Sequence, residues 1–422
     1  MEYNHLDFIG IENIQLMNNW EKGYNPFKFS YIKQTDADEP DWYIASIKMA
    51  NNPIGSINSE ILNASAGTSI YFEEALVRST GEAIERYSSI NYFYMDIPLF
   101  LPIDQNKGFA RCAEFENAPQ SFKKDGIKEK IEHTQVINLI DYSTDYLPYE
   151  TVHLGFTRDK KIGSFYPSIS TGCAFYNDEI IAIFKGICEV VERDAVMKWW
   201  YSNFSNTRRI NSDNVFSYDV RERIRRIKEK NLEIYLFEIS EIDNFPVIFC
   251  LIKGNEFPYA SFGGSCDTNI EKAIIKAIDE AVSIRIMSKY TGVKPIISTE
   301  NFDWINRLEN HMELYANWEN APIINTLVIM EHQMVDANKY TKVKYPNTFD
   351  DLQKIALSFK QKGYDIFYKD LTLPEVAKLG KVIKVVIPQM IPLSQSFNTR
   401  WLGSIIENKS IEEINPYPQP FS

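Results

Sequence analysis

The chain has 422 residues, enough to bury a substantial core in one large domain or two closely packed ones. Its formal net charge of −12 argues against a nucleic-acid partner, whose phosphates would require clustered Lys and Arg. The sequence has no basic amphipathic stretch, no run of about eighteen apolar residues and no basic N-terminal region followed by an apolar run. We therefore expect a soluble, cytoplasmic protein without membrane contact.

The N-terminal part predicts a segment, residues 1–60, that packs on a main domain formed by residues 61–422. Within this segment, Trp42–Lys48 is a strand-like run. The stretch 104–135 is rich in Lys, Glu and Asn and predicts a peripheral loop or helix outside the core. No change in composition marks a flexible linker between domains.

Two later regions predict strands. Glu233–Ser240 and Val247–Lys253 are rich in β-forming residues and are separated by a turn, which indicates a hairpin or adjacent strands. In the C-terminal part, Tyr364–Lys369 and Val382–Ile387 predict strands. Pro374–Leu379 between them predicts a short helix, because Pro stands in its first turn and Gly380 follows its end.

A helix-forming cassette occurs three times, at residues 74–86, 181–194 and 271–285. Each cassette has an Ala seven residues before a Glu and follows a Gly-containing stretch of small residues. These Ala and Glu pairs are Ala75 and Glu82, Ala182 and Glu189, and Ala273 and Glu280. We expect each cassette helix to follow a strand and a Gly turn, which places the carboxylates where helix and sheet meet in an α/β core.

The cassettes carry paired carboxylates. Residues three apart share a helix face, so Glu82 lies beside Glu85 and Glu189 beside Glu192. Two such pairs facing one site would bind magnesium together with phosphate oxygens. Cationic side chains on the same or the next turn could hold the phosphates: Arg86, Arg193, Lys276 and Arg285. The alternative is a solvated helix face with i to i+4 ion pairs, which a single cassette would favour and three related cassettes do not.

Other motifs are excluded or weak. The sequence has neither a phosphate-binding Gly-x-x-x-x-Gly-Lys-Ser/Thr loop nor a Gly-x-Gly-x-x-Gly turn after a strand. The cysteines form no Cys-x-x-Cys pair, so neither a disulfide framework nor structural zinc is indicated. Cys173 and Cys266 could be nucleophiles, but small buried packing is the favoured interpretation. The five histidines are scattered without ligand spacing and are interpreted as structural or surface residues.

Several segments resemble the YcaO superfamily, and together they span about residues 60–420. They are Ser79–Ser88, Ser170–Ala174, Glu189–Ala195, Ala277–Arg285, Lys362–Thr372 and Val382–Leu393. The resemblance implies an α/β fold of the α+β type, in which β-sheets pack against the cassette helices around a central nucleotide site. It also implies ATP and Mg²⁺ as cofactors.

The resemblance is strongest to the azoline-forming cyclodehydratase, or D protein, of thiazole/oxazole-modified peptide biosynthesis. Such enzymes phosphorylate a backbone amide oxygen, so that Cys, Ser or Thr side chains of a ribosomally made precursor peptide cyclise to thiazolines or oxazolines. The proline-rich end, Pro416–Pro420, is similar to the tail of these members, which reaches the active site. Two alternatives are a thioamide-forming member of the same superfamily and a non-catalytic, nucleotide-binding scaffold.

Carried over residue by residue, the resemblance implies magnesium ligands at Glu82, Glu85, Glu189 and Glu192. It implies nucleotide contacts at Arg78, Ser79, Arg86, Asn177, Arg193, Lys276, Glu280 and Arg285. The tail residues with an implied catalytic role are Pro416, Pro418, Pro420 and Ser422. This sequence departs from the family pattern at Tyr176 and Ile181, where Gly and Glu are common, and at Lys276, where Arg is usual. It also has two residues after the last proline.

The resemblance further implies partners. These are the precursor peptide, an E1-like protein that binds its leader and, in some complexes, a flavin dehydrogenase that oxidises the rings. Nothing in the sequence resembles the leader-binding module, so we expect this chain alone to be slow or inactive. A homo- or hetero-oligomer is expected.

Overall fold

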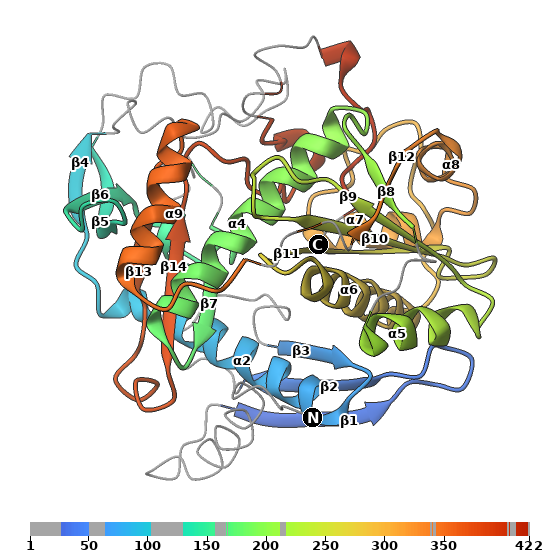
Figure 1. Ribbon diagram of the computed structural model, residues 1–422, viewed down its shortest axis with the longest axis horizontal. Coiled ribbons are helices and arrows are strands. Elements are labelled where there is room, and N and C mark those ends of the chain that lie inside the picture. Colours follow the sequence, from blue (N-terminus) through green and yellow to red (C-terminus); the bar gives the residue numbers. More distant parts are fainter. Residues whose placement is uncertain are drawn as a thin grey trace.

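The computed structural model describes residues 27–49, 64–102, 130–156, 166, 168–211, 217–337, 340, 343–402, 405 and 411–420. Three β-sheets and the helices between them form this part of the chain, with helix α4 (Glu179–Tyr201) running through its middle (Figure 1). The mixture of helix and sheet confirms the expected α/β (α+β) class. No helix in these ranges is long and apolar enough to cross a membrane.

The first sheet is antiparallel and has the order β1-β2-β3. Its strands are β1 (Phe27–Gln34), β2 (Tyr43–Met49) and β3 (Ala64–Ser69). Strand β2 confirms the strand expected at Trp42–Lys48. The first cassette helix, α2 (Phe72–Asn91), follows β3 and packs on β3 and β2. Hydrogen bonds between β2 and β3 thus join the described N-terminal residues to the cassette region, while the division into 1–60 and 61–422 stays a prediction.

The second sheet has the order β11-β10-β9-β8-β12 and is buried on both faces. Strands β9 and β10 pair antiparallel, which confirms the expected hairpin or adjacent strands. In β10, Phe249 and Leu251 point to the core around α4, whereas Ile248 and Cys250 point to α6. The elements are β8 (Arg208–Ile210), β9 (Glu233–Glu238), β10 (Val247–Lys253), β11 (Ala260–Cys266), β12 (Gln333–Val335), α5 (Tyr218–Lys228) and α6 (Ile270–Thr291).

The third sheet has the order β4-β5-β13-β14-β7, with β6 also paired to β5. Its strands are β4 (Leu99–Pro102), β5 (Lys130–Asn138), β6 (Thr144–Pro148), β7 (Cys173–Tyr176), β13 (Phe367–Asp370) and β14 (Lys381–Val386). Two expectations need correction here. Residues 130–135 belong to β5, not to a peripheral loop or helix, while 104–129 lie outside the described residues. Residues 374–379 form turns instead of a helix, and the strands on either side, β13 and β14, pair antiparallel.

Four further helices belong to the described structure. They are α3 (Tyr149–Val152), α7 (Leu308–Asn317), α8 (Pro322–Ile329) and α9 (Phe349–Gln361), with 3-10 turns η1 (Tyr92–Tyr94), η5 (Phe397–Thr399) and η6 (Ile411–Glu413). Helix α7 packs on β11 and on α6, so it lies next to both the third cassette helix and the strand before it.

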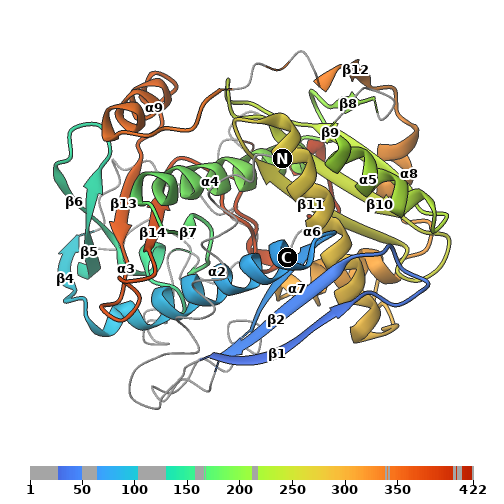
Figure 2. The same cartoon turned by 60° about the horizontal axis from the view of Figure 1, so that its bottom comes forward.

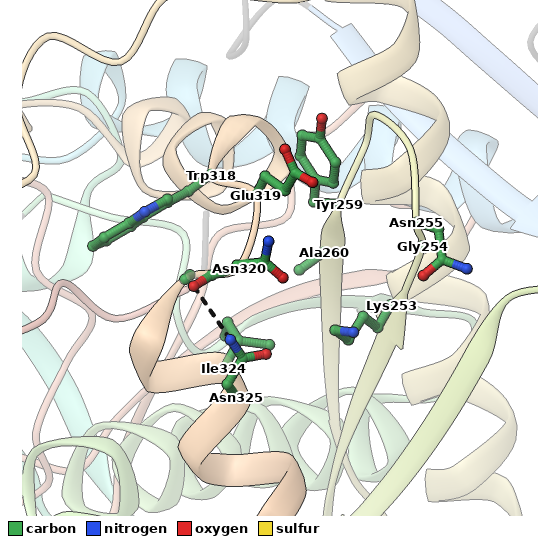
Figure 3. Close-up of a pocket in the computed structure, with 11 residues that line it drawn as sticks. Lys253, Gly254, Asn255, Tyr259, Ala260, Trp318, Glu319, Asn320, Ile324 and Asn325 are labelled. Atoms are coloured by element: carbon green, nitrogen blue, oxygen red, sulfur yellow. Dashed lines mark hydrogen bonds between the residues drawn. The ribbon is translucent and has the colours of Figure 1, made fainter.

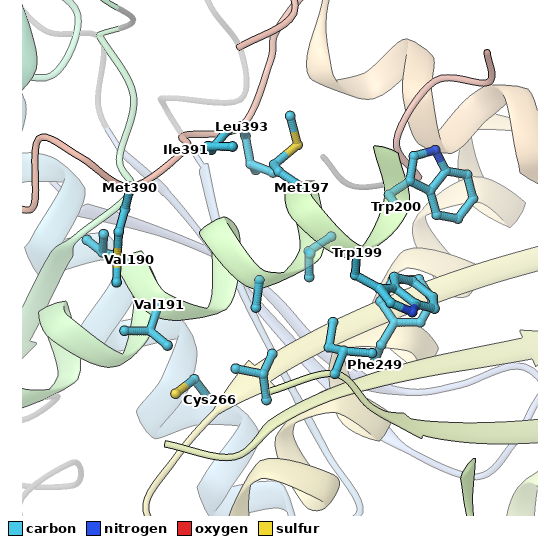
Figure 4. Packing of buried hydrophobic residues seen from close by; sticks show 14 of the residues in the cluster. Val190, Val191, Met197, Trp199, Trp200, Phe249, Cys266, Met390, Ile391 and Leu393 are labelled. Atoms are coloured by element: carbon cyan, nitrogen blue, oxygen red, sulfur yellow. The ribbon is translucent and has the colours of Figure 1, made fainter. Parts of the chain in front are cut away.

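Helix α4, the second cassette, is the centre of the largest core. The Asp178 side chain caps its first turn by accepting a hydrogen bond from the Ile181 N–H at 2.9 Å. Sixteen of its 23 residues are buried, because it packs on β14 and β7 of one sheet and on β11 of another. Figure 4 shows Val191 and Trp199 of α4 packed with Cys266 and Phe249 of the second sheet. A helix with nearly every direction apolar is expected to be buried in this way.

Glycines let the first and third cassette helices lie directly on their strands. A Cβ atom at Gly67 would lie 2.0 Å from the Ala75 carbonyl oxygen, and one at Gly263 would lie 2.1 Å from that of Ala277. Only a residue without a side chain fits such a close approach of two backbones. These glycines lie inside β3 and β11, so the expected Gly turn before the helix is wrong for both cassettes. Gly172, with φ of +84°, does stand in a turn before β7.

Candidate active site

The three cassette helices bring seven charged side chains together at the centre of the molecule. Helix α2 supplies Glu82 and Glu85, α4 supplies Glu189, Glu192 and Arg193, and α6 supplies Lys276 and Glu280. Electrostatic interactions connect all three helices, because Glu85 interacts with Glu189 and with Lys276. In Figure 2, α2, α4 and α6 surround the centre of the molecule. We call these seven residues the carboxylate cluster.

Three carboxylates of the cluster are fixed by backbone donors of the neighbouring strands. Glu82 accepts a hydrogen bond from the Ala66 N–H at 2.8 Å, and Glu280 accepts one from the Gly264 N–H at 2.8 Å. Glu192 accepts one from the Cys266 N–H at 3.2 Å and is only 2% exposed. Strand β3 therefore orients a carboxylate of the helix that follows it, α2, and β11 orients one carboxylate of α6 and one of α4.

The other carboxylate oxygens face cations. Glu82 Oε1 lies 2.5 Å from an Arg86 nitrogen, one helical turn later. Arg193 stands between two helices, because its side chain lies 3.4 Å from Glu192 Oε1 and 3.9 Å from Glu280 Oε1. Four of the expected nucleotide contacts, Arg86, Arg193, Lys276 and Glu280, thus lie beside the expected metal ligands Glu82, Glu85, Glu189 and Glu192.

Negative charge is in excess in the cluster, and the pKa values reflect it. Burial, followed by the charges of Glu189 and Glu82, raises the pKa of Glu85 to about 8. Burial also raises the pKa of Glu189 and brings that of Glu280 to about 7, although Arg193 opposes both shifts. Desolvation by the surrounding protein atoms would lower the pKa of Lys276, although part of the residue is exposed, but Glu192, Glu280 and Glu189 together raise it. Carboxylates crowded in this way gain from an added cation.

The donor set fits magnesium bound together with a polyphosphate. Within the described ranges, no three His, Cys, Asp or Glu side chains are close enough to form a metal cage by themselves. Mg²⁺ usually takes one or two carboxylates and completes its octahedron with water and phosphate oxygens, so a complete protein cage is not required. Solvent still reaches the cluster, since Lys276 is exposed and Glu82, Glu85, Glu189 and Glu280 are only partly buried.

Two arginines expected at the nucleotide make ion pairs outside the cluster. Arg78 donates to Asp279 Oδ2 and to the Thr68 carbonyl, both at 2.7 Å. Arg285 is 5% exposed and donates to both carboxylate oxygens of Glu39, at 2.6 and 3.2 Å, and to a backbone carbonyl. These contacts hold the cassette helices against the N-terminal strands and their connection. A nucleotide role for either arginine stays a prediction.

Ser79 and Asn177 are also apart from the cluster. Ser79 is fully buried, and its carbonyl accepts a hydrogen bond from Ser65 Oγ at 2.7 Å, so it lies in the contact between α2 and β3. Asn177 is exposed just before α4 begins, whereas Glu189 lies about 15 Å further along that helix. The nucleotide contacts expected for both stay predictions.

The proline-rich tail is packed at the C-terminal end of α4. Pro418, Gln419 and Pro420 are buried, and Pro416 is exposed. Three side chains of α4 and α7 hold the tail: Trp200 Nε1 donates to the Tyr417 carbonyl at 3.0 Å, Tyr315 to the Pro418 carbonyl at 2.6 Å, and Tyr201 to Gln419 Oε1 at 2.7 Å. These contacts hold Tyr417, Pro418 and Gln419 against α4 and α7. Ser422 lies outside the described residues, so the catalytic role of Pro416, Pro418, Pro420 and Ser422 stays a prediction.

His311 connects the tail to the rest of the protein and gives a pH-dependent prediction. Its Nδ1 lies 2.9 Å from the Gln419 carbonyl, and burial lowers the pKa of His311 to about 4. The unfolded chain then binds more protons than the folded one, so stability is full above about pH 6.5 and falls as the pH drops toward 4. Between pH 7 and 5, this one residue costs at most about 2 kcal/mol.

Urea unfolding of the wild type and His311→Gln at both pH values measures the effect. The variant is expected to lose less stability on acidification than the wild type, by up to that amount. An equal loss in both proteins would contradict the assignment, since other groups would then carry the acid sensitivity.

The described cysteines and histidines match their structural interpretation, and His5 lies outside the described residues. Cys173, Cys188, Cys250 and Cys266 are buried, and Cys112 lies outside the described residues. Burial raises the pKa of the Cys173 thiol to about 11, which disfavours the thiolate that a nucleophile needs. His133, His153 and His311 are at most 3% exposed.

Sequence reasoning did not identify Asp279, whose carboxylate joins helices α2, α5 and α6 beside the cluster. This carboxylate is 2% exposed and precedes Glu280 in α6. Its oxygens accept hydrogen bonds from Trp42 at 2.8 Å, from Arg78 at 2.7 Å and from Arg223 at 2.8 and 3.1 Å. Burial would raise the pKa of Asp279, but Arg223 and Arg78 hold it below its ordinary value. The one sequence feature that could have indicated Asp279 was its position next to Glu280 in the third cassette.

A polar cavity of about 70 Å³ lies elsewhere, between the β10-β11 turn and the connection from α7 to α8 (Figure 3). Its lining includes Lys253, Tyr259, Trp318, Asn320 and Asn325, and no residue of the carboxylate cluster. The chemistry expected from the cassettes therefore does not use this cavity.

Solved structures of a heterocyclase, a YcaO protein and a microcin synthetase complex have a similar fold. A heterocyclase in complex with substrate and cofactor superposes with a TM-score of 0.76 at 17% identity, covering 100% of this chain and 59% of that chain. A YcaO protein from Methanopyrus kandleri, bound with AMPPCP and Mg²⁺, gives 0.64 at 16% identity, with 92% and 94% covered. The E. coli microcin synthetase McbBCD complex gives 0.63 at 15% identity, with 95% and 98% covered. This chain thus spans about three-fifths of the first heterocyclase, and no curated protein matches it significantly.

Fold and site together define a protein of the heterocyclase fold whose acidic centre suits a magnesium-bound nucleotide. The model of the YcaO family, described as YcaO cyclodehydratase, ATP- and Mg²⁺-binding, matches residues 66–391. The chain belongs to the YcaO family. ATP and Mg²⁺ are accordingly its cofactors, as the resemblance to the YcaO superfamily implied.

Proposed function

We propose that this chain is the ATP-dependent cyclodehydratase subunit of a peptide-modifying system. In this role it phosphorylates a backbone amide oxygen of a ribosomally made precursor peptide, so that Cys, Ser or Thr side chains cyclise to thiazolines or oxazolines. The observation that carries the proposal is the carboxylate cluster. Five glutamates from three helices meet Lys276 and Arg193 in a chain whose family binds ATP and Mg²⁺.

The reaction balances without a redox partner. The amide oxygen takes the γ-phosphoryl group of ATP, and ADP leaves. The Cys, Ser or Thr side chain then forms a bond from its sulfur or oxygen to the amide carbon. Phosphate departs with the original amide oxygen, and the protons of the side chain and of the amide nitrogen are released. The peptide loses the elements of one water per ring.

The protein supplies positioning and charge in this proposal. Bound Mg²⁺ neutralises charge on the phosphates, with Glu82, Glu85, Glu189 and Glu192 as the residues that would hold it. Lys276 is exposed beside three carboxylates, and its raised pKa keeps the ammonium charged for a phosphate contact. Arg193 is oriented by Glu192 and Glu280. Phosphoryl transfer needs mainly such positioning and electrostatic stabilisation, which explains why no side-chain nucleophile is required.

Partners are part of the proposal. The similar heterocyclase was solved with a substrate, and the microcin synthetase is a complex of several proteins that was also solved with pro-MccB17. We infer that this chain works on a precursor peptide together with a leader-binding, E1-like protein, and that a flavin dehydrogenase can join the complex. The cytoplasmic location and the oligomeric state stay predictions.

Mass spectrometry of a co-expressed precursor peptide, with this chain, its leader-binding partner and ATP, tests the proposal. A loss of about 18 Da per Cys, Ser or Thr, the mass of one water, is expected if the amide is activated by phosphorylation. A gain of about 16 Da, from replacement of oxygen by sulfur, would overturn azoline formation in favour of a thioamide. An unmodified peptide from a complex that hydrolyses no ATP would overturn catalysis and leave a nucleotide-binding scaffold.

A further inference from the structure

A lysine on the same face of α4 as the cluster carboxylates ties this helix to the end of strand β11. Lys185 precedes Glu192 by seven residues, about two helical turns, so the two side chains leave α4 in nearly the same direction. The Lys185 ammonium donates a hydrogen bond to Asp267 Oδ2 at 2.6 Å. Asp267 directly follows Cys266, whose N–H donates to Glu192 at 3.2 Å. Two polar contacts thus connect α4 to two successive residues at the end of β11.

Asp267 is only 5% exposed, and both of its oxygens have partners. Its Oδ1 accepts a hydrogen bond from the Asn269 N–H at 2.9 Å. The Tyr345 hydroxyl lies 3.0 Å from Oδ1 and 2.8 Å from Oδ2. Tyr345 also contacts Lys185, whose ammonium lies 3.2 Å from the hydroxyl and 4.6 Å from the centroid of the ring. Burial would lower the pKa of Lys185, but Asp267 and Tyr345 raise it, so the ammonium stays charged.

Apolar packing between α4 and β11 does not specify their relative position as sharply as these contacts do. Figure 4 shows Val191 of α4 and Cys266 of β11, which belong to the same core. Such contacts are non-directional, whereas a hydrogen bond between an ammonium and a carboxylate is short, strong and sensitive to geometry. The pair of Lys185 with Asp267 therefore fixes where α4 lies along the end of β11, and with it the distance from Glu192 to the Cys266 N–H.

We propose that Lys185 and Asp267 are positioning residues, which hold Glu192 in the orientation in which it binds magnesium. This role deepens the proposed function and rests on the magnesium contact proposed there for Glu192. Residues that orient a metal ligand through hydrogen bonds commonly change metal affinity by about 10- to 100-fold when they are removed. Tyr345 belongs to the same arrangement, because it contacts both Lys185 and Asp267 from the segment before α9.

A second lysine of α4 provides a matched control. Lys198 donates to Asp194 Oδ2 at 2.7 Å and to the Tyr364 hydroxyl at 3.3 Å, so it makes the same kinds of contact as Lys185. Its ion pair is also the more buried of the two. Lys198 stands six residues after Glu192 and faces a direction about 120° away from it. Loss of either ammonium should lower stability, but only loss of the Lys185 ammonium should weaken magnesium binding.

Binding of AMPPCP to the full chain, titrated with Mg²⁺, tests this role. In Lys185→Gln, the Mg²⁺ concentration that gives half-maximal binding is expected to rise about tenfold. Excess Mg²⁺ should restore full binding, because every carboxylate of the cluster is still present. Lys198→Gln should leave this Mg²⁺ concentration unchanged, even where thermal unfolding shows an equal or larger loss of stability. Tyr345→Phe removes only a hydroxyl, should raise the Mg²⁺ requirement several-fold, and decides the question if Lys185→Gln does not fold.

An unchanged Mg²⁺ requirement in Lys185→Gln, or an equal rise in both lysine variants, would overturn the positioning role. Glu192→Gln separates this role from the ligand assignment. If Glu192→Gln raises the Mg²⁺ requirement and Lys185→Gln does not, Glu192 stands as a ligand and the positioning role fails. If Glu192→Gln also leaves the requirement unchanged, the magnesium contact proposed for Glu192 fails with it. The expected shifts in a protein whose complex modifies no precursor peptide would support the positioning role and overturn the proposed peptide chemistry.

Discussion

Glu189→Gln is expected to lower ATP hydrolysis by at least about 100-fold, because it removes the carboxylate of an expected magnesium ligand from the carboxylate cluster. The substitution keeps the volume of the side chain. Burial already raises the pKa of Glu189, so a neutral amide should leave the folded protein as stable as the wild type or slightly more so. Steady-state hydrolysis in the reconstituted complex gives the rate, and thermal unfolding without nucleotide gives the stability.

The matched control lies on the same helix. Glu179→Gln changes a partly exposed carboxylate in the first turn of α4, outside the cluster, and should keep wild-type hydrolysis. Wild-type activity in Glu189→Gln would contradict the magnesium assignment. A large loss in both variants would indicate a general disturbance of α4 in place of a specific role for Glu189.

Asp279→Ala is expected to destabilise the protein by about 3 to 5 kcal/mol, because it removes the buried carboxylate that pairs most closely with Arg223, and Glu74, 3.6 Å from Arg223 with a side chain 36% exposed, compensates only in part. Arg223 is 1% exposed and donates two hydrogen bonds to Asp279, Trp42 Nε1 loses its acceptor, and Arg78 keeps the Thr68 carbonyl and Glu74. Since Asp279 joins α6 to α5, α2 and the residue before β2, the loss should also loosen the cluster. The midpoint of urea unfolding, at an unchanged slope, measures the change.

An exposed ion pair provides the control for this prediction. Asp36→Ala removes a carboxylate that lies 3.9 Å from Lys33 at the surface, which should cost less than about 1 kcal/mol. A loss for Asp279→Ala no larger than that of the control would show that Arg223 and Arg78 find other partners. The network would then not be what holds the helices together.

Much of the site followed from local sequence. The cassettes were expected as helices after strands, and α2, α4 and α6 confirm all three. Helical periodicity fixes which residues share a face, so the pairs Glu82 with Glu85 and Glu189 with Glu192 could be predicted before their surroundings were known. The cluster formed by these residues agrees with that prediction, although their role as metal ligands is still untested.

The cationic residues were harder to predict because their partners come from distant parts of the chain. Arg285 stands five residues after Glu280 and therefore faces a direction about 140° away on α6. Its partner there is Glu39, which is 246 residues away in the sequence. Arg78 is four residues before Glu82 and shares its side of α2, yet its guanidinium pairs with Asp279, which is 201 residues away in the sequence. Periodicity indicates a direction, but it does not indicate which oppositely charged group lies there.

Sequence alone predicted an acidic chain with three carboxylate-bearing helices, because those features depend on composition and on contacts within one helix, whereas the magnesium-bound nucleotide followed from the resemblance to the YcaO superfamily. Tertiary structure decided the rest. It placed Gly67 and Gly263 inside strands so that helices could approach, and it folded 374–379 as turns between paired strands. It also formed the Asp279 network. These features depend on side chains hundreds of residues apart meeting in a low-dielectric core, where burial and pairing outweigh local preference.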